Sequence, residues 1–180
     1  MNKFIGKLLL FLAVYIAYIG IVLWIDPYDI YRKESSSKLH DLESKIAFPL
    51  NQRLYLLRQY SLNPTDVVLL GDSRTQALKA SLVEQYTHRS TANLAYGAGA
   101  ISEILDTFWY VTKIHPVKEV YIGLNFNLFN EFNYSGKAAE AIQLLESPER
   151  YVFSKYCYKS LYYILKAIFT GMKTEFGKPQ

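Results

Sequence analysis

The sequence predicts an α/β protein in which one transmembrane helix precedes a flavodoxin-like parallel sheet. Three short apolar segments, each followed by a glycine or a polar turn, alternate with segments whose apolar residues recur at helical spacing. A βαβαβ order of this kind gives a parallel sheet with right-handed crossovers. A long apolar run near the N-terminus supplies the membrane helix.

The apolar run covers Leu8–Ile25 and contains no charged residue. At a rise of about 1.5 Å per residue, it is nearly as long as the hydrocarbon core of a bilayer is thick. Lys3 and Lys7 precede it, Asp26-Pro27 ends it, and no small-residue cleavage pattern comes before that end. We therefore expect residues 1–25 to be an uncleaved signal anchor, with a buried core helix as the alternative. The usual preference of a first anchor places the rest of the chain outside the cytoplasm.

A linking segment and a single domain are expected after the anchor. Residues 26–48 are polar and lack sustained periodicity, which indicates a stalk. Residues 49–180 then form the α/β domain, which begins with a short helix that the Asn63-Pro64 pair ends. The expected strands are Asp66–Leu70, Thr91–Ala95 and Glu119–Gly123, and the helices between them cover Arg74–Gln85 and about Ile101–Trp109.

The segment 149–173 has apolar and aromatic residues around most of a helix, interrupted by Lys155, Lys159 and Lys166. Two interpretations stay open at this point. The helix belongs to the core of the α/β domain, or it is a basic, aromatic helix lying in the membrane interface. Three lysines inside the segment disfavour a second membrane span.

Composition argues against several classes of function. The chain has 20 basic and 16 acidic residues, and its net charge of +4 includes two lysines ahead of the anchor. This balance is too even for a nucleic-acid-binding surface. One cysteine excludes an internal disulfide framework, and together with three scattered histidines it gives no metal-ligand cluster. We expect no nucleic-acid partner and no metal.

The candidate site lies where the three strands end, because the carboxyl ends of parallel strands share one edge of a sheet and ligands bind there. The first turn, Gly71-Asp72-Ser73-Arg74, places Ser73 at a strand-to-helix junction. An exposed serine hydroxyl in such a position is a candidate nucleophile. Ser73 and Gln76 also fit an S-x-x-Q capping box, in which the serine only satisfies N–H groups of its own helix.

The other two turns supply candidate hydrogen-bond donors. Gly97 and Gly99 follow the second strand, and glycines there allow a close backbone approach with N–H groups directed at an anion. Asn125 follows the third strand, where its amide could donate to a developing oxyanion. Ordinary turns also explain these residues, because glycine and asparagine are common turn residues.

Together the three turns resemble those of the SGNH (GDSL-like) hydrolase superfamily. Its members place a Gly-Asp-Ser motif, a glycine motif and a Gly-x-Asn motif at the ends of successive parallel strands, and the resemblance covers residues 66–126. It implies that Ser73 is the nucleophile and that its backbone N–H helps to form an oxyanion hole. Gly97 and Asn125 would supply the other two donors, with Gly99 as the alternative glycine.

The anchor makes the chain similar to the envelope branch of this superfamily, which includes proteins of exopolysaccharide O-acetylation and of D-alanyl transfer to teichoic acid. The resemblance implies a serine esterase or O-acyltransferase that needs no cofactor. Its partners would be the lipid bilayer and an acylated envelope polysaccharide or acyl donor. The expected location is the cell membrane, with the main domain on the extracytoplasmic side.

One element of the superfamily pattern is missing. The C-terminal Asp-x-x-His motif, which supplies the general base, does not occur in this sequence. The three histidines are His40, which precedes the sheet, and His88 and His115, which are expected at the amino ends of the strands. We therefore expect the chain to be the front part of such an enzyme and to be inactive alone. The alternative is a non-catalytic envelope module that binds a glycan or another membrane protein.

Overall fold

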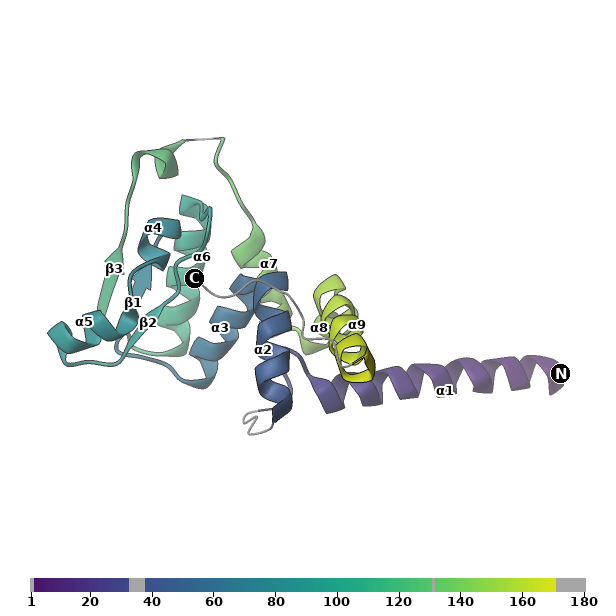
Figure 1. Cartoon of the computed structure of the whole chain (residues 1–180). Coiled ribbons are helices and arrows are strands. Elements are labelled where there is room, and N and C mark those ends of the chain that lie inside the picture. The colour runs from purple at the N-terminus through teal and green to yellow at the C-terminus, as the bar shows by residue number, and fades with distance from the viewer. Residues whose placement is uncertain (1, 33–37, 131, 171–180) are drawn as a thin grey trace. The chain divides into compact units, whose positions relative to one another are not determined.

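The computed structural model describes residues 2–32, 38–130 and 132–170 (Figure 1). Contacts divide the chain into two compact units, and each is described by itself. Residues 1–50 and 148–180 form the first, which we call the anchor unit, and residues 51–147 form the second, which we call the sheet unit. In sequence, the sheet unit is thus inserted between two segments of the anchor unit.

The anchor unit is helical in its described residues. Its helices are α1 (Asn2–Ile25), α2 (Lys38–Leu50), α8 (Pro148–Val152) and α9 (Lys155–Thr170). Helix α9 packs mainly on α2 and also contacts α8 and α1. The buried face of α9 recurs at helical spacing, as amphipathic packing requires. It consists of Cys157, Ser160, Leu161, Ile164 and Ala167.

The chain leaves α1 through a turn that Asp26 organises. Helix α1 ends at Ile25, in agreement with the stop predicted from the sequence. The buried Asp26 carboxylate accepts the backbone N–H groups of Ile30, Tyr31 and Arg32 at 2.7–3.0 Å. Burial raises the pKa of Asp26, and these three donors oppose that shift because they stabilise the charged form.

The sheet unit contains a three-stranded parallel sheet in the order β2-β1-β3. The strands are β1 (Val67–Leu70), β2 (Thr91–Asn93) and β3 (Glu119–Ile122). All of β1 is buried because it is the central strand, whereas the last two residues of β3 are exposed. Helices α3 (Gln52–Leu62), α6 (Ile101–Ile114) and α7 (Lys137–Glu146) pack on one another, and α6 also contacts β1.

Shorter elements complete the unit: α4 (Ser73–Gln76), α5 (Ala80–Thr87) and a 3₁₀ turn, η1 (Phe126–Phe129). The sequence predicted one helix over 74–85, and the structure divides it into α4 and α5. The reason lies in Asn93 at the end of β2, whose side-chain amide donates to the carbonyls of Thr75 and Leu78 at 2.9 and 2.7 Å. The Thr75 carbonyl also accepts a hydrogen bond from the Leu78 N–H at 3.0 Å, so the chain here closes a tighter turn than an α-helix.

The α/β class and the parallel pairing of the three predicted strands are confirmed. Two segments differ from the sequence prediction. The second half of the expected stalk forms α2, which buries Ile46 and Ala47. The predicted helix over 149–173 is broken into α8 and α9, and both belong to the anchor unit.

Candidate functional site at the carboxyl edge of the sheet

The three candidate turns follow the carboxyl ends of three adjacent parallel strands. Backbone hydrogen bonds continue past the strands and hold the turns together. The Tyr96 N–H donates to the Gly71 carbonyl at 3.1 Å, and the Gly123 N–H donates to the Leu70 carbonyl at 2.8 Å. The first turn therefore lies between the other two. The sheet order β2-β1-β3 explains this placement, because the strand before the Gly-Asp-Ser turn is central.

Ser73 is the first residue of α4 and not its cap. Asp72 is the N-cap, and its carboxylate accepts the N–H of Arg74 at 3.0 Å. The capping interpretation of Ser73 is therefore wrong: Asp72 already performs that function one residue earlier. The Ser73 side chain is exposed, and its hydroxyl has no hydrogen-bond partner among the described residues.

Asn125 is turned toward the first turn. Its side-chain Nδ2 donates to Asp72 Oδ2, which joins the end of β3 to the residue directly before Ser73. Its Oδ1 is buried and accepts no hydrogen bond from the described part of the chain. An amide nitrogen has two N–H groups, so one donor of Asn125 remains after the bond to Asp72.

The two candidate glycines differ in what surrounds them. A side chain on Gly99 would place its Cβ 3.0 Å from the Gly71 carbonyl oxygen, and the Gly99 N–H already donates to Tyr96 at 3.0 Å. The Gly97 N–H makes no hydrogen bond to any described residue. Gly99 is therefore needed for close packing of two turns, and Gly97 is the better candidate donor.

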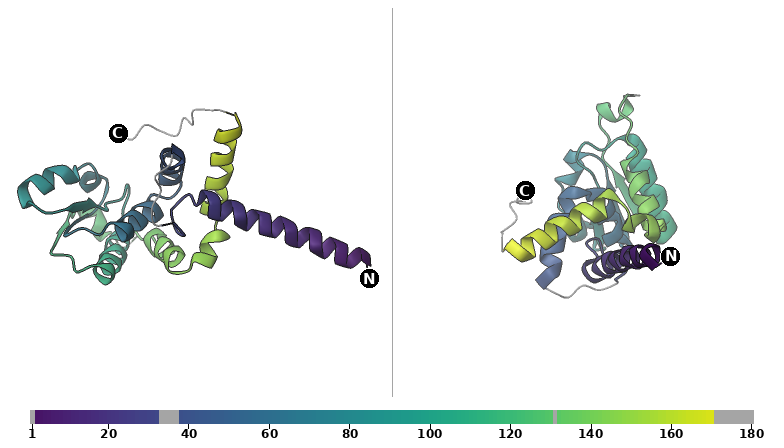
Figure 2. Two further views of the ribbon diagram at one scale, coloured as in Figure 1. Left: turned by 90° about the horizontal axis from the view of Figure 1, so that it is seen from below. Right: turned by 90° about the vertical axis from the view of Figure 1, so that its right-hand side faces the viewer.

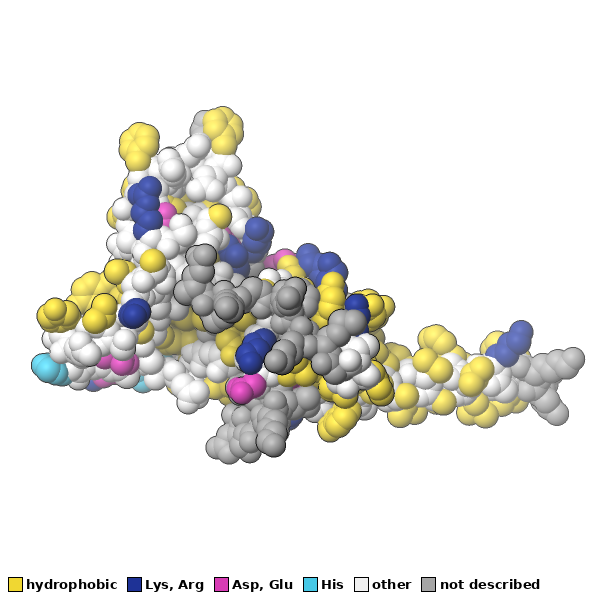
Figure 3. Space-filling model, viewed as in Figure 1, with side chains coloured by type: hydrophobic (Ala, Val, Ile, Leu, Met, Phe, Trp, Pro, Cys, Tyr) yellow, Lys and Arg dark blue, Asp and Glu magenta, His cyan; other side chains and the backbone are white. Residues whose placement is uncertain are grey.

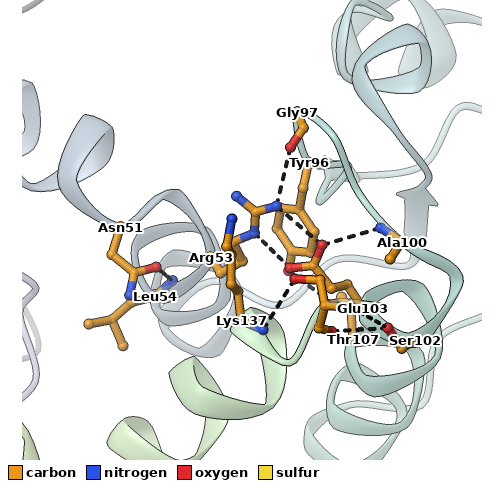
Figure 4. A network of polar contacts seen from close by, with 11 residues as sticks. Asn51, Arg53, Leu54, Tyr96, Gly97, Ala100, Ser102, Glu103, Thr107 and Lys137 are labelled. Atoms are coloured by element: carbon orange, nitrogen blue, oxygen red, sulfur yellow. Dashed lines mark hydrogen bonds and ion pairs between the residues drawn. The ribbon is translucent and has the colours of Figure 1, made fainter. Parts of the chain in front are cut away.

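A buried ion pair holds the glycine turn in place (Figure 4). Arg53 of α3 pairs with the fully buried Glu103 of α6, with Nε 2.9 Å from Oε1, and it also donates to the Gly97 carbonyl at 3.2 Å. The guanidinium lies 4.9 Å from the centre of the Tyr96 ring. Glu103 in turn accepts the Ala100 N–H at 3.2 Å. Arg53 thus holds the end of the turn at Tyr96 and Gly97, and Glu103 holds the end at Ala100.

Sequence reasoning missed this pair because the two residues lie far apart in the chain and have no motif spacing. It also missed Thr75, which is buried between the ends of β1 and β3. A Cβ on Gly71 or on Gly123 would lie 2.2 or 1.8 Å from Thr75 Oγ1. These glycines are therefore required by the packing of Thr75, which the sequence does not reveal.

No histidine accompanies Ser73 among the described side chains. His88 is exposed at the C-terminal cap of α5, and His115 caps α6, with its Nε2 3.8 Å from Asp66 Oδ1. His115 lies beside Asp66, which directly precedes β1, so this histidine lies at the amino edge of the sheet as predicted. His40 is in α2, and its side chain lies outside the described residues. In the described ranges, no cluster of His, Cys, Asp and Glu could hold a metal ion.

In the described part of the chain, one helix, Phe4–Ile25, is long and apolar enough to cross a membrane. Comparisons with family models, curated proteins and solved structures found no match to this chain. The class that the fold defines is an α/β protein with a three-stranded parallel sheet and one candidate membrane helix.

Proposed function

We propose that this chain carries the nucleophile and the oxyanion-binding turns of an SGNH-type serine esterase or O-acyltransferase. The main support is the hydrogen bond from Asn125 to Asp72, which brings the third turn to the residue before the exposed Ser73. The substrate class is an ester-linked acyl group of a cell-envelope polysaccharide. Helix α1 would anchor the chain in the cell membrane, with the sheet unit on the extracytoplasmic side.

The chemistry would be acyl transfer through a covalent intermediate. Ser73 Oγ attacks the ester carbonyl carbon, and the carbonyl oxygen becomes an oxyanion. The oxyanion accepts hydrogen bonds from the backbone N–H groups of Ser73 and Gly97 and from the side-chain amide of Asn125. The alcohol then leaves with a proton, and the acyl group stays on Ser73. A glycan hydroxyl or water attacks this acyl ester, takes the acyl group and regenerates the serine.

This scheme names no acceptor for the proton of Ser73, because neither His88 at the end of α5 nor His115 at the end of α6 lies near it. A serine hydroxyl without a base is a weak nucleophile. We therefore expect this chain to have negligible esterase turnover. Exogenous imidazole, which is the side-chain base of histidine, should replace part of the missing function.

A fluorophosphonate reagent tests the proposal, with the Ser73 adduct quantified by mass spectrometry. We expect slow labelling of Ser73 that imidazole accelerates and that rises with pH, because hydroxide or added base must remove the proton. Asn125→Ala should slow the labelling by about 10²-fold, the low end of the loss of one oxyanion donor. Ser135→Ala is the matched control, and it should leave the labelling of Ser73 unchanged.

One result would contradict the proposal, and another would contradict only the expected lack of turnover. One is labelling spread over several serines, with no preference for Ser73 and no response to imidazole. The other is rapid turnover of an activated aryl acetate that Ser73→Ala abolishes without added imidazole. The second result would show that the chain supplies its own base for Ser73.

The second candidate function is a non-catalytic envelope module, and one observation favours it. The segment directly after Asn125 exposes four aromatic rings, and Phe126 is 92% exposed. The others are Phe129, Phe132 and Tyr134. Exposed aromatic rings mark an interaction surface, and the neighbouring site has no histidine base for turnover among the described residues. This combination favours binding of a glycan or a partner over catalysis. Loss of glycan binding in Phe126→Ala but not in Ser73→Ala would favour this function over the enzymatic one.

A further inference from the structure

The corner between α8 and α9 contacts α1 well inside its apolar run. The Tyr18 hydroxyl donates to the Val152 carbonyl at 2.6 Å. The Phe153 ring stacks on Tyr15 and Tyr18, with ring centres 6.1 and 6.4 Å apart. All of these residues belong to the anchor unit.

The position of these contacts along α1 gives their depth in a bilayer. Tyr18 lies seven residues before Ile25 and Tyr15 lies ten, which is about 10 and about 15 Å along a helix axis. If α1 spans the membrane, Phe153 therefore reaches below the headgroups on the side where the chain leaves the bilayer. An aqueous position for this corner is incompatible with a spanning α1.

One backbone carbonyl at this corner has a side-chain partner of the kind that a membrane environment requires. A carbonyl at the end of a helix lacks an intrahelical partner, and in lipid no water is present to replace it. The Val152 carbonyl, at the end of α8, instead accepts the Tyr18 hydroxyl. That bond also gives a partner to a tyrosine hydroxyl within the apolar run.

Helix α9 has the direction and the surface of an interfacial helix. It runs across α1 and not along it, so it would lie in the membrane plane if α1 crosses the bilayer (Figure 2). Its outward side exposes aromatic rings, with Tyr158 65% and Phe169 83% exposed. Lys159 and Lys166 are exposed on the same helix, which contains no acidic residue.

Long lysine side chains can keep their charge in the headgroup layer while their stems and the neighbouring rings contact acyl chains. The apolar surface of α9 also adjoins that of α1, whose hydrophobic side chains are exposed along its length (Figure 3). A lipid-covered surface on α1 would thus continue onto the α8–α9 corner.

We propose that α9 lies in the plane of the membrane interface, with Phe153 inserted into the bilayer beside α1. The ligand of this surface is the lipid bilayer itself. The proposal rests on the anchoring of α1 in the membrane, which is part of the proposed function. It is independent of any chemistry at Ser73.

Quenching of tryptophan fluorescence by lipids with brominated acyl chains tests this placement in the full chain. The sequence has two tryptophans, so Trp24→Phe and Trp109→Phe give a background without any. Tyr158→Trp or Tyr162→Trp is added to this background, and the protein is reconstituted into vesicles of equal parts phosphatidylcholine and phosphatidylglycerol. We expect each introduced tryptophan to lose about half of its fluorescence or more in brominated vesicles. Unbrominated vesicles are the control.

A third protein, Trp109→Phe alone, keeps Trp24 near the end of the apolar run and reports whether α1 is in the membrane. Absence of quenching at Trp24 would overturn the anchoring of α1, and the interfacial placement with it. Quenching at Trp24 without quenching at positions 158 and 162 would overturn only the placement of α9. In that case, an emission that stays blue-shifted in vesicles would assign the α9 surface to a protein contact.

Discussion

Thr75 is the residue that closes the carboxyl edge of the sheet. Its side chain fills the space between Gly71 at the end of β1 and Gly123 at the end of β3. Its carbonyl accepts the Asn93 amide from the end of β2 at 2.9 Å. One buried threonine thus contacts the ends of all three strands, two residues beyond the candidate nucleophile Ser73.

We predict that Gly123→Ala destabilises the sheet unit by about 1–3 kcal/mol, the usual penalty for overpacking. The added Cβ would lie 1.8 Å from Thr75 Oγ1. Removing that oxygen in the double variant Gly123→Ala/Thr75→Ala should restore part of the stability, since Thr75 Cβ is 3.1 Å away. Urea unfolding in detergent, followed by Trp109 fluorescence in a Trp24→Phe background, measures these changes.

Two further variants are controls for this prediction. Gly136→Ala should change stability little, because the nearest atom to its Cβ is 3.8 Å away. Thr75→Ala should not rescue Gly71→Ala, because a Cβ at Gly71 is still only 2.7 Å from Thr75 Cβ. Equal effects of all three glycine substitutions would contradict the role of Thr75.

At the residue scale, the sequence predicted the turns better than the side-chain contacts within them. The order of Gly71-Asp72-Ser73, Gly97 and Asn125 after three strands was sufficient to place these turns at one edge. The bond of Asn125 to Asp72 and the capping by Asp72 were not predicted. The bond of Asn125 has no sequence signal. Aspartate is a preferred N-cap residue, but the local sequence does not decide between Asp72 and the adjacent Ser73, which is also of a preferred type.

At the scale of elements, the Arg53–Glu103 pair joins three parts of the sheet unit: α3, α6 and the turn that carries Gly97. Glu103 is fully buried, and the Arg53 side chain is 13% exposed. Removing one member of such a pair leaves an uncompensated charge in the interior. The pair therefore controls the position of the turn as well as the stability of the unit.

We predict that Arg53→Met destabilises the sheet unit by about 3–5 kcal/mol, because it leaves the Glu103 carboxylate buried without its cation. The double variant Arg53→Met/Glu103→Met should be more stable than Arg53→Met, because the buried charge is then absent. Thermal unfolding in detergent measures both. A double variant that is less stable than either single variant would show that the hydrogen bonds to Gly97 and Ala100 matter more than the charge.

Helices and strands of the sheet unit were largely predictable, because buried faces produce periodic patterns. The break between α4 and α5 was not, since it depends on Asn93, which lies on a different element. The same limit applies to α2: its surrounding sequence is polar, and Ile46 and Ala47 are the buried hydrophobic residues in the part of this helix whose burial is described. A short amphipathic pattern of this kind is difficult to distinguish from a linker.

At the scale of the whole molecule, the chain forms part of the anchor unit, then the sheet unit, and then returns to the anchor unit. Sequence reasoning assigned residues 49–180 to one domain, because periodicity shows that a segment is a helix but not which partner it packs against. The return has a functional consequence. Both ends of the sheet unit are joined to the anchor unit. If α1 is a membrane anchor, the returning chain would bring α8 and α9 back to the membrane surface.

The orientation of this arrangement leads to the last prediction. Lys3 and Lys7 precede the apolar run, and positive charge beside a first anchor is retained on the cytoplasmic side. Alkaline phosphatase, which folds only outside the cytoplasm, should therefore be active when fused after Gln180, and a reporter active only in the cytoplasm should be silent there. Replacing both lysines by glutamine should shift part of the population to the opposite orientation. A strong cytoplasmic signal from the unaltered chain would reverse the orientation and exclude an extracellular polysaccharide as the substrate of Ser73.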